Sequence, residues 1–147
     1  MNRNVVTEQI IEAKIRHGIR WSDVAESVGG SKEWVTASCL GQMAFTAEQA
    51  AKVADIFKLP PEAIAVLQVP PTRGTLESPV PSDPLIYRLY EIVSVYGTTL
   101  KELIHEEFGD GIMSAIDFRM DVARLEHEAG DRVGITMSGK FLPYKPY

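Results

Sequence analysis

The sequence has little with which to build disulfides or metal sites. Its 147 residues include one cysteine, Cys39, and three histidines, His17, His105 and His127. One thiol forms no intramolecular disulfide, and the histidines lack the clustered Cys/His spacing of a metal site. We therefore expect a cytoplasmic protein without a metal site, in which Cys39 is a small buried apolar residue.

The sequence also lacks an excess of positive charge and a long apolar run. The net charge is −5, with seven Lys and Arg against eight Asp and Glu in residues 1–70, and eight against twelve in residues 71–147. Nucleic-acid binders need cations to neutralise phosphates, and a membrane-spanning helix needs about 20 apolar residues. We expect neither nucleic acid nor a membrane as a partner.

What is present in the first half is helical periodicity broken by glycine and proline. Ser22, Ser31 and Thr46 are expected N-caps, and Gln49 completes a capping-box pattern with Thr46. Gly18 is expected to end the first helix. We predict five helices, over residues 5–18, 21–30, 31–42, 46–59 and 62–69.

Two short helices joined by a glycine turn resemble a helix-turn-helix, and residues 5–69 resemble the five-helix domain of phage repressors. One interpretation is DNA binding, and the other is a helical bundle used for packing or assembly. The second helix of the pair offers only Lys32 as a base-reaching cation, beside Glu33, and Arg20 alone lies near its partner. Phosphate contacts dominate DNA affinity, so we favour the bundle. A repressor-like transcription factor whose second half binds an effector is the rival hypothesis.

A proline-rich segment separates the two halves. Residues 69–84, "VPPTRGTLESPVPSDP", hold five prolines and predict an extended linker. We therefore predict a helical domain over residues 1–70, a linker over 71–83, and a second domain over 84–147.

The second half predicts two helices followed by strands, which makes the fold class α+β. Asp83 and Pro84 suit a helix start, and Gly97 is expected to divide that helix from a second one ending at Gly109. We interpret "GDGIMSAIDF" as a turn or short helix, and the alternation from Ile116 as a strand. Residues 126–132 predict a turn, and residues 133–144 one or two strands with a tight turn at Ser138–Gly139. So small a sheet has open edges, and we expect an intertwined oligomer.

The helix "PLIYRLYEIVSVY" is apolar on most sides yet carries Arg88 and Glu91. Burial on most sides would again require other subunits. The simpler account of the two charges is an i,i+3 salt bridge, which contributes about 0.2–0.5 kcal/mol when exposed. The alternative is that Arg88 binds a small planar anion through its guanidinium fork and that Glu91 orients it.

Ser114 follows two glycines, and a serine there can present its hydroxyl to an anion. An ordinary turn or cap serine is the alternative. Asp110 and Asp117 could assist such a site, although turn and strand roles suit them better. We interpret His105 as a helix-surface or interface residue.

Several segments together resemble the cyanase family, also called cyanate hydratase or cyanate lyase. They are "YRLYE", "VYGTTLK", "HEEFGDGI" and "SAIDF", accompanied by "CLGQMAF", "VPPTRG" and the ending "SGKFLPYKPY". The resemblance runs from about residue 5 to the C-terminus. Asp117 stands where a neutral Asn is also seen in relatives.

The resemblance implies a lyase that converts cyanate and bicarbonate into carbon dioxide and carbamate, which decomposes to ammonia and carbon dioxide. It implies catalytic roles for Arg88, Glu91 and Ser114 and no metal or organic cofactor. It also implies a homodecamer of five dimers, with interlocked C-terminal domains, active sites between subunits, and a repressor-like N-terminal domain that does not bind DNA.

Overall fold

The computed structural model describes residues 1–74 and 78–146, which form six helices and a two-stranded antiparallel sheet. The α+β class is confirmed. The chain divides into two compact units, of which the first ends at Gly74. Residues 75–77 of the predicted linker, and Tyr147 at the end of the predicted second domain, lie outside the described residues.

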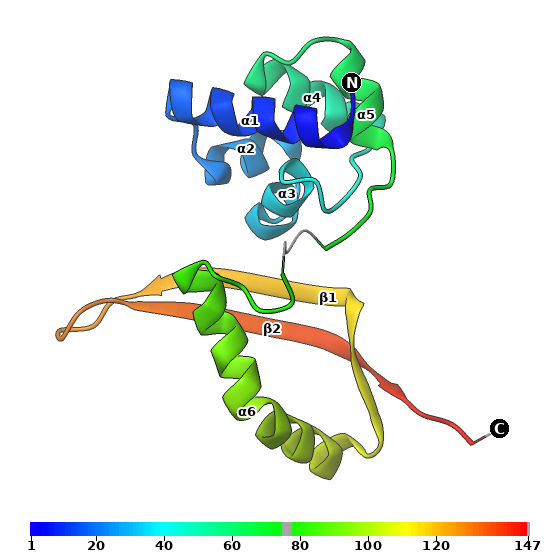
Figure 1. Cartoon of the computed structure of the whole chain (residues 1–147), viewed down its shortest axis with the longest axis vertical. Coiled ribbons are helices and arrows are strands. Elements are labelled where there is room, and N and C mark those ends of the chain that lie inside the picture. The colour runs from blue at the N-terminus through cyan, green and yellow to red at the C-terminus, as the bar shows by residue number, and fades with distance from the viewer. Residues whose placement is uncertain (75–77, 147) are drawn as a thin grey trace. The chain divides into compact units, whose positions relative to one another are not determined.

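The first unit is built from short helices around one core (Figure 1). Its elements are α1 (Arg3–His17), α2 (Trp21–Val28), α3 (Lys32–Cys39), α4 (Ala47–Phe57) and α5 (Glu62–Gln68).

Local capping explains where most of these helices begin and end. Gly18 ends α1 in the left-handed conformation, at φ 63°. Ser31 caps α3, and Thr46 and Gln49 form the predicted capping box of α4. The predicted cap at Ser22 is wrong, because α2 begins at Trp21 with Arg20 in the N-cap position, and the Ser22 hydroxyl donates to the Asp23 carboxylate.

The core of the first unit holds aliphatic and aromatic side chains from all five helices. Phe57, Ile10 and Leu67 are the largest fully buried side chains. Arg3 joins the elements around this core, since its guanidinium donates to the carbonyls of Ser38, Met43 and Val66. Cys39 is fully buried, as predicted, and burial raises the pKa of its thiol to about 12.

The second unit begins with one long helix, α6 (Pro84–Phe108). Its start is as predicted, with the Asp83 carboxylate accepting from the backbone N–H groups of Leu85 and Ile86 at 2.9 Å. The predicted break at Gly97 is wrong. A glycine inside a helix costs only about 1 kcal/mol, and the intact hydrogen-bond ladder on both sides outweighs it. Gly109, at φ 85°, ends the helix instead.

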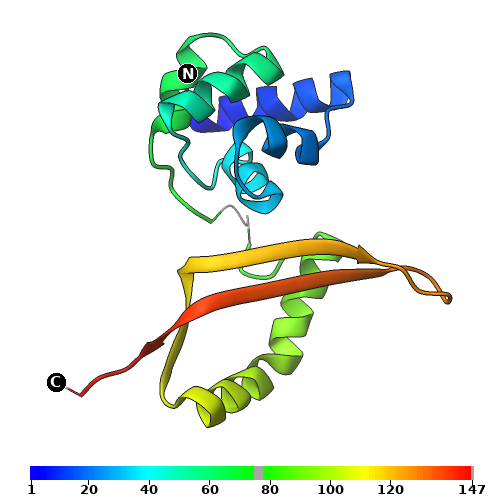
Figure 2. The ribbon, with the colours of Figure 1, turned by 180° about the vertical axis from the view of Figure 1, so that it is seen from behind.

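Two long strands complete the second unit, β1 (Gly111–Leu125) and β2 (Arg132–Pro143). They pair antiparallel, and α6 lies on one side of the hairpin (Figures 1 and 2). The interpretation of "GDGIMSAIDF" as a turn or short helix is wrong, because β1 already begins at Gly111. The predicted turn at Ser138–Gly139 is also wrong, since both residues pair within β2. Backbone pairing across the hairpin outweighs the local turn preference of that dipeptide.

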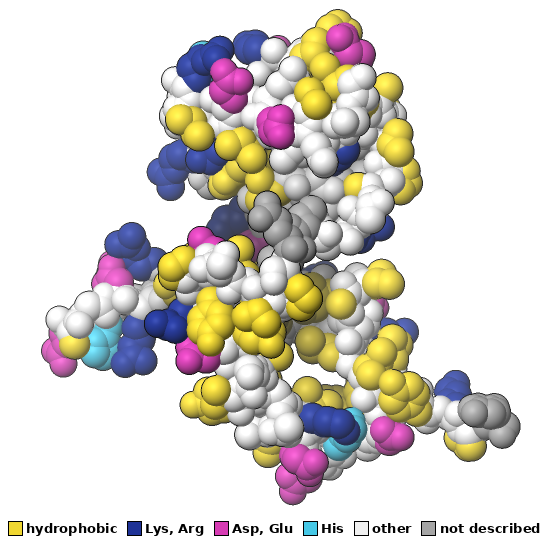
Figure 3. Space-filling model, in the orientation of Figure 1, with side chains coloured by type: hydrophobic (Ala, Val, Ile, Leu, Met, Phe, Trp, Pro, Cys, Tyr) yellow, Lys and Arg dark blue, Asp and Glu magenta, His cyan; other side chains and the backbone are white. Residues whose placement is uncertain are grey.

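Most large apolar side chains of the second unit are exposed to solvent. No residue of α6 is buried, and Figure 3 shows hydrophobic side chains gathered on the surface over this helix. Within one chain the helix is therefore not covered on most sides. Its burial by other subunits stays a prediction.

Candidate active site

Arg88 and Glu91 lie one turn apart on α6 and form an ion pair. Arg88 Nη1 donates to Glu91 Oε2 at 3.1 Å, with the side chains 68% and 48% exposed. An exposed pair of this kind contributes little to stability. The geometry holds the guanidinium beside a carboxylate while leaving its remaining N–H groups accessible to an anion.

Ser114 occupies a different position, near the start of β1, and is only 7% exposed. Its Oγ accepts from the backbone N–H groups of Ile116 at 3.1 Å and Asp117 at 3.0 Å. A hydroxyl oxygen has two lone pairs and one proton. Both acceptor positions are used, so the free capacity of this hydroxyl is to donate.

A bulge in the hairpin produces this arrangement. Met113 pairs with Phe141 and Phe118 pairs with Gly139, so the four residues between them on β1 face one residue, Lys140, on β2. A bulge bends the strand and redirects its side chains, and β1 turns sharply in Figures 1 and 2. Ser114 is buried, whereas Ile116 is 98% exposed.

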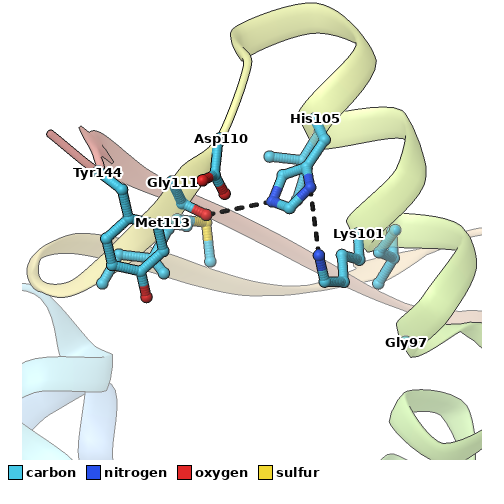
Figure 4. A pocket seen from close by; sticks show the side chains of 10 residues that line it. Gly97, Lys101, His105, Asp110, Gly111, Met113 and Tyr144 are labelled. Carbon is cyan, nitrogen blue, oxygen red and sulfur yellow. Dashed lines mark hydrogen bonds between the residues drawn. The ribbon is translucent and has the colours of Figure 1, made fainter. Parts of the chain in front are cut away.

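A hollow of about 370 Å³ lies where α6 meets the start of β1 (Figure 4). Lys101 Nζ donates to His105 Nδ1 at 3.2 Å, and His105 Nε2 lies 3.2 Å from the Gly111 carbonyl. The carbonyl accepts only, so Nε2 carries the proton and Nδ1 accepts. The Asp110 carbonyl also accepts from the Tyr144 backbone N–H at 3.1 Å.

His105 therefore ties the last turn of α6 to the first residue of β1. Sequence reasoning considered it only as a surface or interface residue and did not identify Lys101. The i,i+4 spacing of these two side chains on one helix was the available signal. These contacts hold the strand that carries Ser114, three residues after Gly111.

The structure brings together Arg88 and Glu91 but not the whole predicted set. Among residues 1–74 and 78–146, no hydrogen bond or ion pair joins Ser114 to either of them. Asp117 contributes its backbone N–H to Ser114 rather than its carboxylate. Gly139, whose backbone closely approaches the Ser114 carbonyl, was missed because its sequence context resembled a turn.

Among residues 1–74 and 78–146, no group of three or more His, Cys, Asp and Glu side chains could hold a metal ion. None of the helices in these residues combines the length and the apolar composition that a membrane span requires.

Two family profiles match this sequence. The "Cyanate lyase C-terminal domain" matches residues 78–146, and "Cyanate hydratase, N-terminal" matches residues 3–71. The chain belongs to the cyanate lyase family. The predicted resemblance is confirmed.

Similar proteins match over nearly all or all of their lengths. The cyanate hydratase of Polynucleobacter asymbioticus is 63% identical over 147 residues, which cover 100% of both chains. That of Cupriavidus necator is 65% identical over the same span. The crystal structure of cyanase from T. urticae matches with a TM-score of 0.82 and 39% identity, covering 95% of this chain and 97% of that one.

Proposed function

We propose that this chain is a cyanate hydratase that catalyses the bicarbonate-dependent decomposition of cyanate to carbamate and carbon dioxide. Carbamate then gives ammonia and a second carbon dioxide, so the reaction would remove a toxic anion and supply nitrogen. The observation that carries the proposal is the pair of family matches over residues 3–71 and 78–146. The residue types at Arg88, Glu91 and Ser114 agree with it.

The chemistry begins with two small anions that repel each other. A bicarbonate oxygen attacks the cyanate carbon and forms a mixed anhydride. The bond between that oxygen and the bicarbonate carbon then breaks, releasing carbon dioxide and leaving the cyanate carbon in carbamate. The bicarbonate proton and one further proton end on nitrogen. Holding both reactants together contributes roughly 7–11 kcal/mol to such a step, and no cofactor is needed.

Each proposed catalytic residue has a role that its surroundings permit. Arg88 neutralises and orients one or both anions, since its guanidinium matches a planar, carboxylate-like group. Glu91 holds Arg88 in place through the 3.1 Å contact. Ser114 donates its hydroxyl proton to developing negative charge, and fixed donors of this kind contribute about 3–4 kcal/mol each.

The working form in this proposal is a homodecamer of five dimers in the cytoplasm, with interlocked second units and sites shared between subunits. Two observations support this form. The apolar surface of α6 is uncovered in the single chain, and no hydrogen bond or ion pair among the described residues joins Ser114 to the Arg88–Glu91 pair. Nucleic acid is not a proposed partner. The one cation of α3, Lys32, lies 2.6 Å from the Glu33 carboxylate.

The test is an ammonia assay with purified protein and cyanate, with and without bicarbonate. We expect ammonia release to depend on bicarbonate. With 13C-cyanate, the label should enter carbamate before it enters carbon dioxide. Equal ammonia release in bicarbonate-free buffer would contradict the proposal and indicate simple hydrolysis.

A further inference from the structure

The backbone of β2 lies unusually close to the peptide of Ser114, at Gly139. A Cβ built on Gly139 would lie 2.3 Å from the Ser114 carbonyl oxygen and 3.3 Å from the Ser114 carbonyl carbon. Contacts below 3.0 Å to backbone atoms force the structure to shift. Only glycine lets the two strands approach to this distance.

This close approach occurs at the boundary of the bulge. Gly139 pairs with Phe118, the first residue of β1 after the four bulged residues. The same bulge folds Ile116 and Asp117 back, so that their N–H groups reach Ser114 Oγ. A Cβ at Gly139 would therefore collide with the residue whose hydroxyl is oriented by the bulge.

We infer that Gly139 is a positioning residue for the Ser114 hydroxyl. The absence of a side chain at Gly139 permits the bulge in which Ile116 and Asp117 donate to Ser114 Oγ, which leaves the hydroxyl proton free to donate. The inference deepens the proposed function and rests on it for its effect on turnover. Gly139 itself touches no reacting atom. It acts through Ser114, because a larger residue would displace the Ser114 peptide and break the two bonds to Oγ.

Gly139→Ala tests the inference, with Gly134→Ala as its matched control. Gly134 lies on the same strand, but the three atoms nearest to a Cβ there would be Leu125 side-chain atoms, at 3.0–3.4 Å, which can move. Misplacing a catalytic group by about 1 Å can cost about 100-fold. We expect Gly139→Ala to lower kcat by about that factor, with KM for cyanate within about threefold. Gly134→Ala should keep kcat within about threefold of the wild type.

A double-mutant cycle separates positioning from general damage. In a Ser114→Ala background, Gly139→Ala should lower the residual kcat by less than about threefold, because the group it positions is gone. An unchanged kcat in Gly139→Ala would overturn the inference. So would an equal loss in both backgrounds, or an equal loss in Gly134→Ala.

Amide hydrogen exchange provides a readout that does not need activity. The Ile116 and Asp117 amides should exchange slowly in the wild type and lose protection in Gly139→Ala and in Ser114→Ala. If the wild type shows no bicarbonate-dependent turnover, the proposed function fails while this measurement still tests Gly139. If Gly139→Ala does not fold, the wild type decides: protected amides support the inference, and unprotected ones overturn it because no fixed bulge exists.

Discussion

The first unit, which ends at Gly74, buries a core of its own, whereas the second unit exposes almost all of its large apolar side chains. Every residue of the hydrophobic core lies between Val6 and Leu67. In α6 and the hairpin, Leu85, Ile92 and Ile116 are exposed. In the first unit, five helices that follow one another bury apolar side chains against each other and form a core. One helix and one hairpin offer too few layers, since a layer buries its apolar face only against another.

The largest predicted effect is a loss of stability when the core of the first unit is disrupted. Phe57 is 2% exposed and contacts Trp21, with ring centroids 6.1 Å apart. Phe57→Ala should lower the free energy of unfolding of this unit by about 3–5 kcal/mol, through lost burial and a cavity. Urea denaturation followed by tryptophan fluorescence measures it. A loss below about 1 kcal/mol would mean that this core is not closed within one chain.

The next effect concerns catalysis in the second unit. Arg88→Lys should lower kcat/KM for cyanate by about 100–1,000-fold, because an ammonium cannot replace the guanidinium fork. Arg124→Lys is the matched control, since Arg124 also donates to a carboxylate, that of Asp131, at 3.0 Å. Steady-state kinetics on variants of equal oligomeric size measure both. Near-normal turnover in Arg88→Lys would remove Arg88 as the anion-binding residue.

A third change tests whether other subunits cover α6. Ile92 is 51% exposed in the single chain, where truncation would matter little. If a partner subunit buries Ile92, then Ile92→Ala should weaken association by about 1.5–3 kcal/mol per buried site. The assembly would then dissociate at a higher protein concentration than the wild type. Light scattering over a dilution series measures this. Ile15→Ala, on the exposed surface of α1, is the control, and identical dilution curves would contradict coverage of α6.

A fourth prediction uses the buried thiol of the first unit. Burial raises the pKa of Cys39 from 9.0 to about 12. The protonated thiol therefore stabilises the native state fully below pH 9, and this contribution is lost as pH rises from 9 towards 12. The loss is about 1.4 kcal/mol per pH unit in that window. Between pH 8 and pH 10, the free energy of unfolding should fall more in the wild type than in Cys39→Ala. Denaturation at the two pH values measures both falls, and equal falls would contradict the raised pKa of Cys39.

The smallest effect should come from a helix cap. The Thr46 hydroxyl accepts from the Gln49 N–H at 3.2 Å, and the Gln49 side chain accepts in return from the Thr46 N–H at 3.1 Å. Thr46→Ala should lower the unfolding free energy of the first unit by about 1 kcal/mol and leave turnover unchanged. Thermal denaturation measures the first effect and the ammonia assay the second. Lost turnover with unchanged stability would show that the two units are coupled at this helix.

Sequence reasoning succeeded where the determining interactions are local. The caps at Ser31, Thr46 and Asp83 depend on groups within three residues, so composition and spacing predict them. The catalytic candidates came mainly from the family resemblance, because one Arg and one Glu on a helix are equally compatible with a simple ion pair. The break predicted at Gly97 failed because a single glycine does not outweigh the hydrogen bonds of a 25-residue helix.

The α+β class, the helical first half and the family could be predicted from the amino-acid sequence. They follow from periodicity, local capping and motif, which are all properties of neighbouring residues. The position of Ser114 in a bulge, with its hydroxyl left to donate, became evident only from the pairing of the strands. The same pairing makes Gly139 a strand residue in close contact with Ser114. These features depend on the register between β1 and β2, which brings Ser114 close to Gly139, 25 positions later in the sequence. Register is set by pairing across the hairpin rather than by either segment alone.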